Sequence, residues 1–257
     1  MTVKIFLPLY GDLSEDDLRK SIKYYIKKLL SALNIDYIEV VKVTPRYTHI
    51  SVTGDDAEVA QKYLIHVVGT QLRIEDLVVG GEYSGRVHHV DVRDVHIDIG
   101  LDPPILVRVP KLDILRRIVG TKKTPERWLS TAFRLTGISK HFPLSVKIST
   151  LQLQGDSPVM VGILGRRSLS MFRRWMNDRL DRVVVYGVSR SQLDKKIRKS
   201  RLHRRIVRIE RLGPLEHAVV CRYGEFADVV AEKLTRYGVK KYSIFMPRRL
   251  RKMITAT

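Results

Sequence analysis

The segment 88–98 (HHVDVRDVHID) places imidazoles and carboxylates close together in the sequence. Imidazole nitrogens and carboxylate oxygens form mixed sites for divalent metals, such as a metal-dependent nuclease would use. On a strand, residues two apart share a face, so His89 can lie beside Asp91 and His96 beside Asp98. The solvent face of a sheet gives the same polar alternation, and no helix-borne His pair or Cys pair fixes a site. We therefore expect no metal, cofactor or catalytic residue, and a nuclease or RNA-modifying enzyme remains an alternative.

A glycine-bounded turn at 162–168 (GILGRRS) joins a predicted strand to a predicted helix. The unpaired N–H groups and the dipole of a helix N-terminus attract anions, and Arg166 and Arg167 add charged hydrogen-bond donors. The turn is similar only in outline to the GxxG loop of KH domains, which joins two helices, and it lacks the P-loop lysine pattern. We expect an RNA phosphate here, with an ordinary strand-to-helix connection as the alternative.

Positive charge gathers in the last third of the chain. Residues 148–257 contain 25 Lys and Arg against 9 Asp and Glu, whereas residues 1–76 contain 10 against 11. Such an excess of positive charge is typical of proteins that bind a polyanion, so we expect a nucleic acid as the binding partner. A membrane surface is not expected, because it would need a helix with a broad apolar face. The predicted phosphate contacts are Arg166, Arg167, Arg173, Arg174, Lys195, Lys196, Arg198, Lys199, Arg201, Arg204 and Arg205.

Three predicted units must position these residues. Residues 1–76 show the order βαββα, and their near-neutral charge suits a protein partner. Residues 77–153 contain short strands with a helical insertion, a pattern that can curl into a barrel. Residues 154–257 alternate strands and helices, as α/β domains do. The sequence therefore predicts an α+β multidomain protein with a β-barrel centre and a basic α/β C-terminal domain.

Composition limits the class of protein further. The net charge is +20, while 44% of the 257 residues are hydrophobic, so a disordered or low-complexity chain is excluded. Cys221 is the single cysteine and no apolar run has the length of a membrane span or signal peptide, so we expect a cytoplasmic protein. Asn, Gln, Cys and Met are scarce, which is typical of a heat-loving source. The surface ion-pair networks of heat-stable proteins need both signs of charge, and the C-terminal third has few acids. Such networks therefore do not explain the excess of Lys and Arg there.

Three short segments carry a resemblance to a known module: 81–87 (GEYSGRV), 95–100 (VHIDIG) and 105–110 (ILVRVP). They resemble the opening strands of an OB-fold RNA-binding module of the ribosomal-protein type. The whole chain also resembles an uncharacterised archaeal protein family in which such a module lies between two α/β segments, and 212–221 (LGPLEHAVVC) is similar to its C-terminal signature. The resemblance implies RNA binding without naming a reaction. On such a barrel Tyr83, His88 and His96 would stack on bases, although Tyr83 could equally pack within the sheet.

These observations predict a non-catalytic protein that binds structured RNA. Folded RNA presents dense phosphates to an arginine-rich surface, and the resemblance to an OB-fold module favours RNA over DNA. Ribosomal RNA or a ribosomal subunit is the expected partner, so we expect a ribosome-associated factor in translation or in ribosome storage (hibernation). A DNA-binding, transcription-associated module remains a second alternative.

Overall fold

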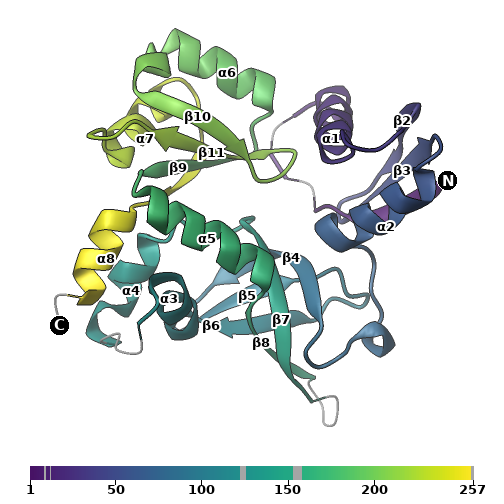
Figure 1. The fold of residues 1–257 in the computed structure, drawn as a ribbon, viewed down its shortest axis with the longest axis horizontal. Helices are drawn as coiled ribbons and strands as arrows, with labels where there is room; N and C mark the ends of the chain where they lie inside the picture. The colour runs from purple at the N-terminus through teal and green to yellow at the C-terminus, as the bar shows by residue number, and fades with distance from the viewer. Residues whose placement is uncertain (9, 12, 122–125, 153–157, 256–257) are drawn as a thin grey trace.

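The computed structural model describes residues 1–8, 10–11, 13–121, 126–152 and 158–255 (Figure 1). It is a mixed α+β structure with a closed barrel in the middle, as the sequence predicts. None of the helices in these ranges has both the length and the apolar character needed to cross a bilayer.

The N-terminal unit is a three-stranded antiparallel sheet in the order β1-β3-β2 that shares one core with two helices. Ile22 and Ile26 recur at helical spacing and are fully buried against the sheet. The first helix begins at Ser14, whose hydroxyl accepts a hydrogen bond from the amide of Asp17 at 3.2 Å. The elements are β1 (Thr2–Phe6), α1 (Glu15–Leu29), β2 (Tyr37–Val43), β3 (Tyr47–Thr53), α2 (Ala57–Val68) and η1 (Ile74–Asp76).

Five of the described strands close into the barrel in the order β4-β5-β6-β8-β7. Neighbouring strands are antiparallel except β6 and β8, which run parallel. Strand β8 lies beyond the predicted domain boundary at residue 153, yet its pairing with β6 and β7 completes the barrel. The Thr-Pro pair at 124–125 predicts a helix start, and it lies outside the described residues. The elements are β4 (Glu82–Val90), β5 (Asp94–Asp98), β6 (Leu106–Pro110), α3 (Lys111–Val119), η2 (Glu126–Trp128), α4 (Leu129–Arg134), β7 (Pro143–Gln152) and β8 (Val159–Leu164).

The C-terminal unit has the order βαββαβ and the sheet order β10-β11-β9-β12. Each helix connects two strands that are not neighbours, as in the split βαβ arrangement of ferredoxin-like folds. Every hydrogen-bonded pair is therefore antiparallel, and the predicted α/β domain is corrected to an α+β unit. The elements are β9 (Arg182–Tyr186), α6 (Arg190–Lys199), η3 (Leu202–Arg204), β10 (Ile206–Arg211), β11 (Glu216–Cys221), α7 (Ala227–Arg236) and β12 (Lys241–Phe245).

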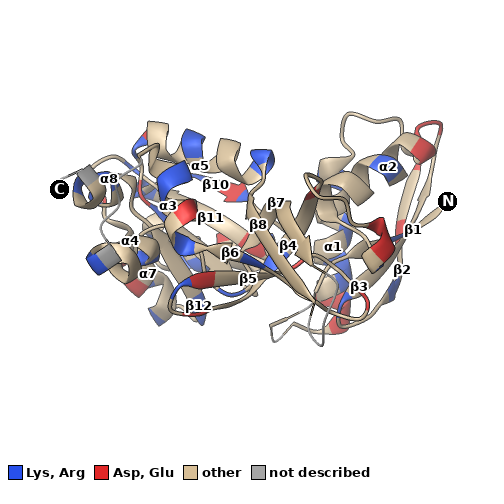
Figure 2. Cartoon of the chain, turned by 90° about the horizontal axis from the view of Figure 1, so that it is seen from below, with Lys and Arg blue, Asp and Glu red and all other residues tan. Residues whose placement is uncertain are grey.

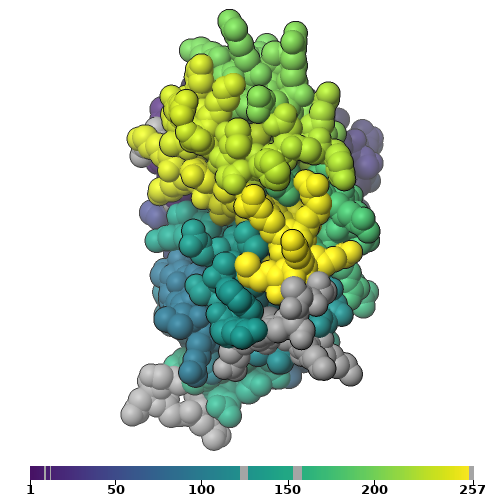
Figure 3. Space-filling view, turned by 90° about the vertical axis from the view of Figure 1, so that its left-hand side faces the viewer, coloured from purple at the N-terminus to yellow at the C-terminus, as the bar shows by residue number. Residues whose placement is uncertain are grey.

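Two helices, α5 (Arg166–Asp178) and α8 (Pro247–Thr255), join the barrel to the C-terminal sheet. Phe172 and Trp175 of α5 and Phe245 of β12 are fully buried in the shared core. The basic segment 248–252 (RRLRK) forms most of α8. Leu250 and Ile254 anchor this helix in the core, and Figure 3 shows it in yellow across the seam between the two units.

Candidate nucleic-acid interface

The predicted phosphate contacts divide into two groups on opposite faces of the C-terminal sheet. Figure 2 shows Lys and Arg on several elements of this part of the molecule. Helix α5 packs with the barrel core on one face of the sheet, whereas α6 packs on the other face with α7. One continuous patch of all eleven residues is therefore not formed. The α5 group is Arg166, Arg167, Arg173 and Arg174, and the α6 group is Lys195, Lys196, Arg198, Lys199, Arg201, Arg204 and Arg205.

The N-terminus of α5 already holds an internal anion. The carboxylate of Glu82 on β4 accepts hydrogen bonds from the amides of Arg166 at 3.0 Å and Arg167 at 3.2 Å. A carboxylate complements both the unpaired amides and the positive end of the helix dipole. The amides expected to bind an RNA phosphate are thus occupied by Glu82, and the phosphate prediction for this turn is corrected.

An arginine cleft of about 780 Å³ opens where α5, the barrel and the N-terminal unit meet. Arg167 donates to the carbonyl of Val67 at 3.1 Å and to the hydroxyl of Ser84, so it ties α5 to α2 and β4. Arg86 is ion-paired with Glu216. These cations stabilise the junction of the three units, which leaves the exposed Arg166 and Arg174 to meet an external anion. The arginine cleft is lined by Arg86, Arg166, Arg167, Arg174 and Arg211.

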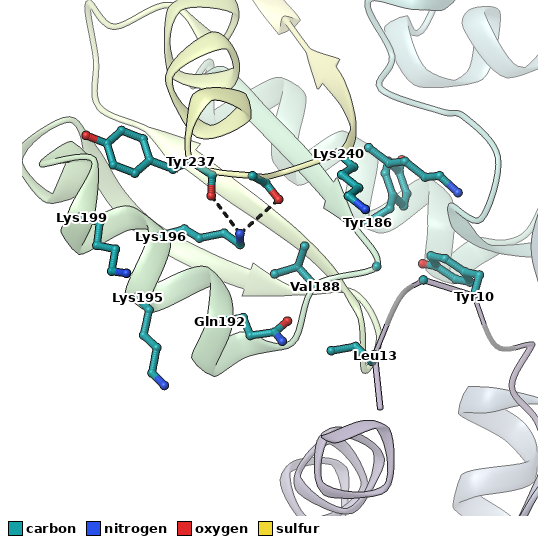
Figure 4. Close-up of a pocket in the computed structure, with 14 residues that line it drawn as sticks. Tyr10, Leu13, Tyr186, Val188, Gln192, Lys195, Lys196, Lys199, Tyr237 and Lys240 are labelled. Carbon is teal, nitrogen blue, oxygen red and sulfur yellow. Dashed lines mark hydrogen bonds between the residues drawn. The ribbon is translucent and has the colours of Figure 1, made fainter. Parts of the chain in front are cut away.

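A second cavity, of about 400 Å³, lies between α6, the start of β12 and the segment that leads into α1 (Figure 4). We name it the lysine pocket for the five lysines that line it: Lys195, Lys196, Lys199, Lys240 and Lys241. Its volume falls within the range of small-molecule and phosphate sites. No Asp or Glu occurs among its described lining residues.

One face of α6 forms one wall of the lysine pocket. Gln192, Lys195, Lys196 and Lys199 recur every three or four residues, so they line one side of the helix. Leu193 and Ile197 point to the core on another side and are at most 6% exposed. The helix begins with a capping box in which Ser189 and Gln192 exchange hydrogen bonds between side chain and backbone, which fixes its orientation.

The other wall depends on a close approach of two backbones. Gly11 and Gly187 lie so close that a Cβ on Gly11 would come within 3.3 Å of the Gly187 backbone, and both have positive φ. Tyr10, beside Gly11, stacks on His141 of the barrel with ring centroids 3.7 Å apart. Its hydroxyl donates to Glu216, and burial together with this carboxylate raises the pKa of the Tyr10 phenol. The phenol therefore stays neutral and closes the end of the pocket.

Most of the positive charge in the lysine pocket is not balanced by an acid among the residues that the structure describes. Lys196 donates to the carbonyls of Tyr237 at 2.9 Å and Gly238 at 3.1 Å, which are dipoles and not charges. Within the described part of the chain, Lys195, Lys199 and Lys241 have no carboxylate within ion-pair distance. Several ammonium groups around one cavity repel one another, so an anion bound among them is stabilised.

The rest of the α6 group extends the charge beyond the pocket. Arg198, Arg201 and Arg204 are exposed on α6, at its end and on η3. Arg205 differs, because its guanidinium is 3.1 Å from the carboxylate of Glu225. Among the described residues the three exposed arginines have no carboxylate partner, whereas Arg205 has one.

The imidazole and carboxylate segment forms the end of the β4–β5 hairpin. His89, Asp91 and His96 come together there, each with one ligand atom within 4.8 Å of the others. Asp98 is separated from them, because its carboxylate pairs with Arg46 of the N-terminal unit at 2.9 Å. Tyr83 is half-buried and its hydroxyl accepts from the amide of Val78 at 2.8 Å, which agrees with the packing alternative.

Sequence reasoning missed Lys240, Lys241 and Tyr10. The Gly238 turn and the lysine pair after it gave a local sign of an exposed basic loop, and nothing more. Helix α6 lies next to this loop because of the order of the strands in the sheet. Tyr10 lies at the same pocket because it contacts residues that are far away in the chain. Neither has a local signature.

Part of this interface is similar to a known domain family. Residues 180–232 match the family described as the DUF2110 C-terminal domain. The match extends from the residues before β9 into α7, so it includes the lysines of α6 and the segment 212–221 that the sequence resemblance rests on. Lys240, Lys241 and Tyr10 lie outside it. No curated protein matches the chain.

Proposed function

We propose that the protein binds structured RNA without cleaving it, with the lysine pocket holding one backbone phosphate and the exposed arginines of the α6 group holding its neighbours. The observation that carries this proposal is the pocket itself, which is lined by five lysines and by no Asp or Glu among its described residues. A nucleic acid presents phosphates at regular intervals along its backbone. Contacts of lysine and arginine side chains with these phosphates dominate the affinity of proteins for nucleic acids.

The barrel supports a nucleic acid as the partner. Its strand order, the parallel contact of β6 with β8 and the helices between its third and fourth strands are features shared with OB folds. Small barrels of this kind bind oligonucleotides. Ribosomal RNA is the target we favour, because folded RNA concentrates phosphates for a surface of this charge. A cytoplasmic, ribosome-associated role in translation or ribosome storage belongs to the same proposal.

The proposal is tested with a structured RNA and a duplex DNA of equal length, whose affinities are measured by fluorescence anisotropy between 50 and 200 mM salt. We expect tighter binding to RNA and, with about four phosphate contacts, a loss of affinity of roughly a hundredfold over this range. Equal affinity for DNA would favour the transcription-associated alternative, and a flat salt response would contradict phosphate binding. Co-sedimentation with ribosomal subunits at low salt tests the favoured target.

A further inference from the structure

The end of the β4–β5 hairpin brings two imidazoles and a carboxylate into one cluster. One ring nitrogen each of His89 and His96 and one carboxylate oxygen of Asp91 lie within 4.8 Å of one another. The cluster is on the barrel, apart from both basic clefts, and the proposed RNA contacts do not use it. Its residues were expected to be the ordinary polar face of a sheet, but that expectation does not explain their convergence.

A β-bulge creates the convergence. The register of β4 against β5 shifts between Val87 and His89, so His88 is an extra residue and both His88 and His89 point to solvent. The shift places His89 directly opposite His96, and their rings stack with centroids 4.1 Å apart and planes 11° apart. His88 lies beside them, with its Nδ1 3.0 Å from Nδ1 of His89, close enough to orient that ring.

The turn of the hairpin holds the carboxylate in place. Oδ1 of Asp91 accepts hydrogen bonds from the amides of Arg93 at 2.9 Å and Asp94 at 2.7 Å, which leaves Oδ2 to face Nε2 of His96 at 2.7 Å. The hydrogen bonds to Asp91 lower its pKa to about 2, the bond from the Asp94 amide contributing most. Lys111 donates to the backbone carbonyls of Asp91 and Val92 and so stiffens the turn.

We propose that His89, Asp91 and His96 bind one divalent transition-metal ion. Two imidazole nitrogens and one carboxylate oxygen suit Zn²⁺ well, whereas Mg²⁺ and Ca²⁺ prefer oxygen ligands. Zinc bonds of about 2.0 to 2.2 Å require ligand atoms about 3.3 Å apart, and the atoms of the cluster already lie within 4.8 Å of one another. Because a metal ion lies in the plane of each imidazole that binds it, one of the two stacked rings must rotate out of the stack when the ion binds. Three protein ligands leave the remaining position to water. The positive charge of the nearby Lys140 repels a bound cation, and the negative charge of the Asp91 carboxylate offsets this repulsion.

The test uses the full, untagged chain after treatment with a chelator, without RNA, so it is independent of the proposed function. Zn²⁺ is titrated by calorimetry, and Co²⁺ is titrated by visible absorption. We expect one ion per chain with a micromolar or tighter dissociation constant. His89→Gln and His96→Gln should each weaken binding at least tenfold. The matched control is His203→Gln, which removes an exposed imidazole from η3 and should leave binding unchanged.

The variants are expected to fold, because His89 is exposed and His96 lies at the surface end of the hairpin. Equal melting temperatures of the metal-free proteins would confirm this. A metal-induced rise in melting temperature that occurs in the wild type and is absent in His96→Gln would support the site. Binding that does not saturate at one ion per chain, or that is unchanged in His96→Gln, would overturn it.

Discussion

The guanidinium of Arg86 in the barrel lies 2.8 Å from the carboxylate of Glu216 in the C-terminal sheet, and both side chains are less than 10% exposed. Tyr10 of the N-terminal segment donates to the same carboxylate. One buried ion pair therefore connects all three units of the protein. Its position explains how the Tyr10 wall of the lysine pocket is fixed relative to the wall formed by α6.

Replacing Glu216 with Ala should lower the free energy of unfolding by about 3 to 5 kcal/mol, because the buried charge of Arg86 loses its partner. The double variant Arg86→Met with Glu216→Leu should recover most of this loss, since no charge is then buried. Urea denaturation measures both. A loss below about 1 kcal/mol in Glu216→Ala would contradict the structural importance of this pair.

Stability should fall in acid because of His217. This imidazole is fully buried and donates from Nε2 to the carbonyl of Val188 at 3.0 Å, while burial lowers its pKa to about 3. The unfolded chain binds a proton near pH 6.5 and the folded chain does not, so stability is complete above that pH and decreases toward pH 3.

Between pH 7.5 and 5.0 the loss from His217 should be about 2 kcal/mol. The measurement is the urea midpoint at these two pH values for the wild type and for His217→Gln. The variant should lose correspondingly less stability on acidification. If both proteins lose the same amount, His217 is not the titrating group.

The internal anion at α5 gives a further prediction. Glu82→Ala removes the acceptor for the amides of Arg166 and Arg167 and should lower stability by about 1 to 2 kcal/mol. Phosphate at the same ionic strength as chloride should restore part of the loss by occupying the vacated helix end. The control is Glu58→Ala, which removes an exposed carboxylate on α2 and should have little effect. Equal effects of the two substitutions would show that Glu82 is not a cap.

The sequence predicted those features that depend on local periodicity. The helical spacing of Ile22 and Ile26 identified α1, and the alternation around Val95 and Ile97 identified a barrel strand. The clustering of charge pointed to the basic residues of α6, three of whose lysines line a cavity, and their contact with phosphate stays a prediction. These signals are encoded within a few residues of one another.

Contacts between distant residues could not be predicted in the same way. Glu82 satisfies the start of α5 although 84 residues separate it from Arg166, and Tyr10 meets Glu216 across 206 residues. The bulge that turns His88 and His89 outward breaks the two-residue period used to assign faces. Pairing between β6 and β8 likewise moved a strand from the predicted third domain into the barrel.

The central claim is that the lysine pocket binds RNA phosphate, and a comparison of two triple variants tests it most directly. Lys195, Lys199 and Lys241 are changed to Gln in one, and the exposed Lys27, Lys28 and Lys42 of the N-terminal unit are changed to Gln in the other. Both variants lose the same charge, and Lys196 is left intact because it bonds to backbone carbonyls.

Affinity for a structured RNA is measured by anisotropy as a function of salt concentration. We predict that the pocket variant binds at least tenfold more weakly and that its salt dependence is shallower by about one phosphate contact, while the control stays within twofold of the wild type. Equal losses in the two variants would mean that only net charge attracts RNA, and would contradict the site.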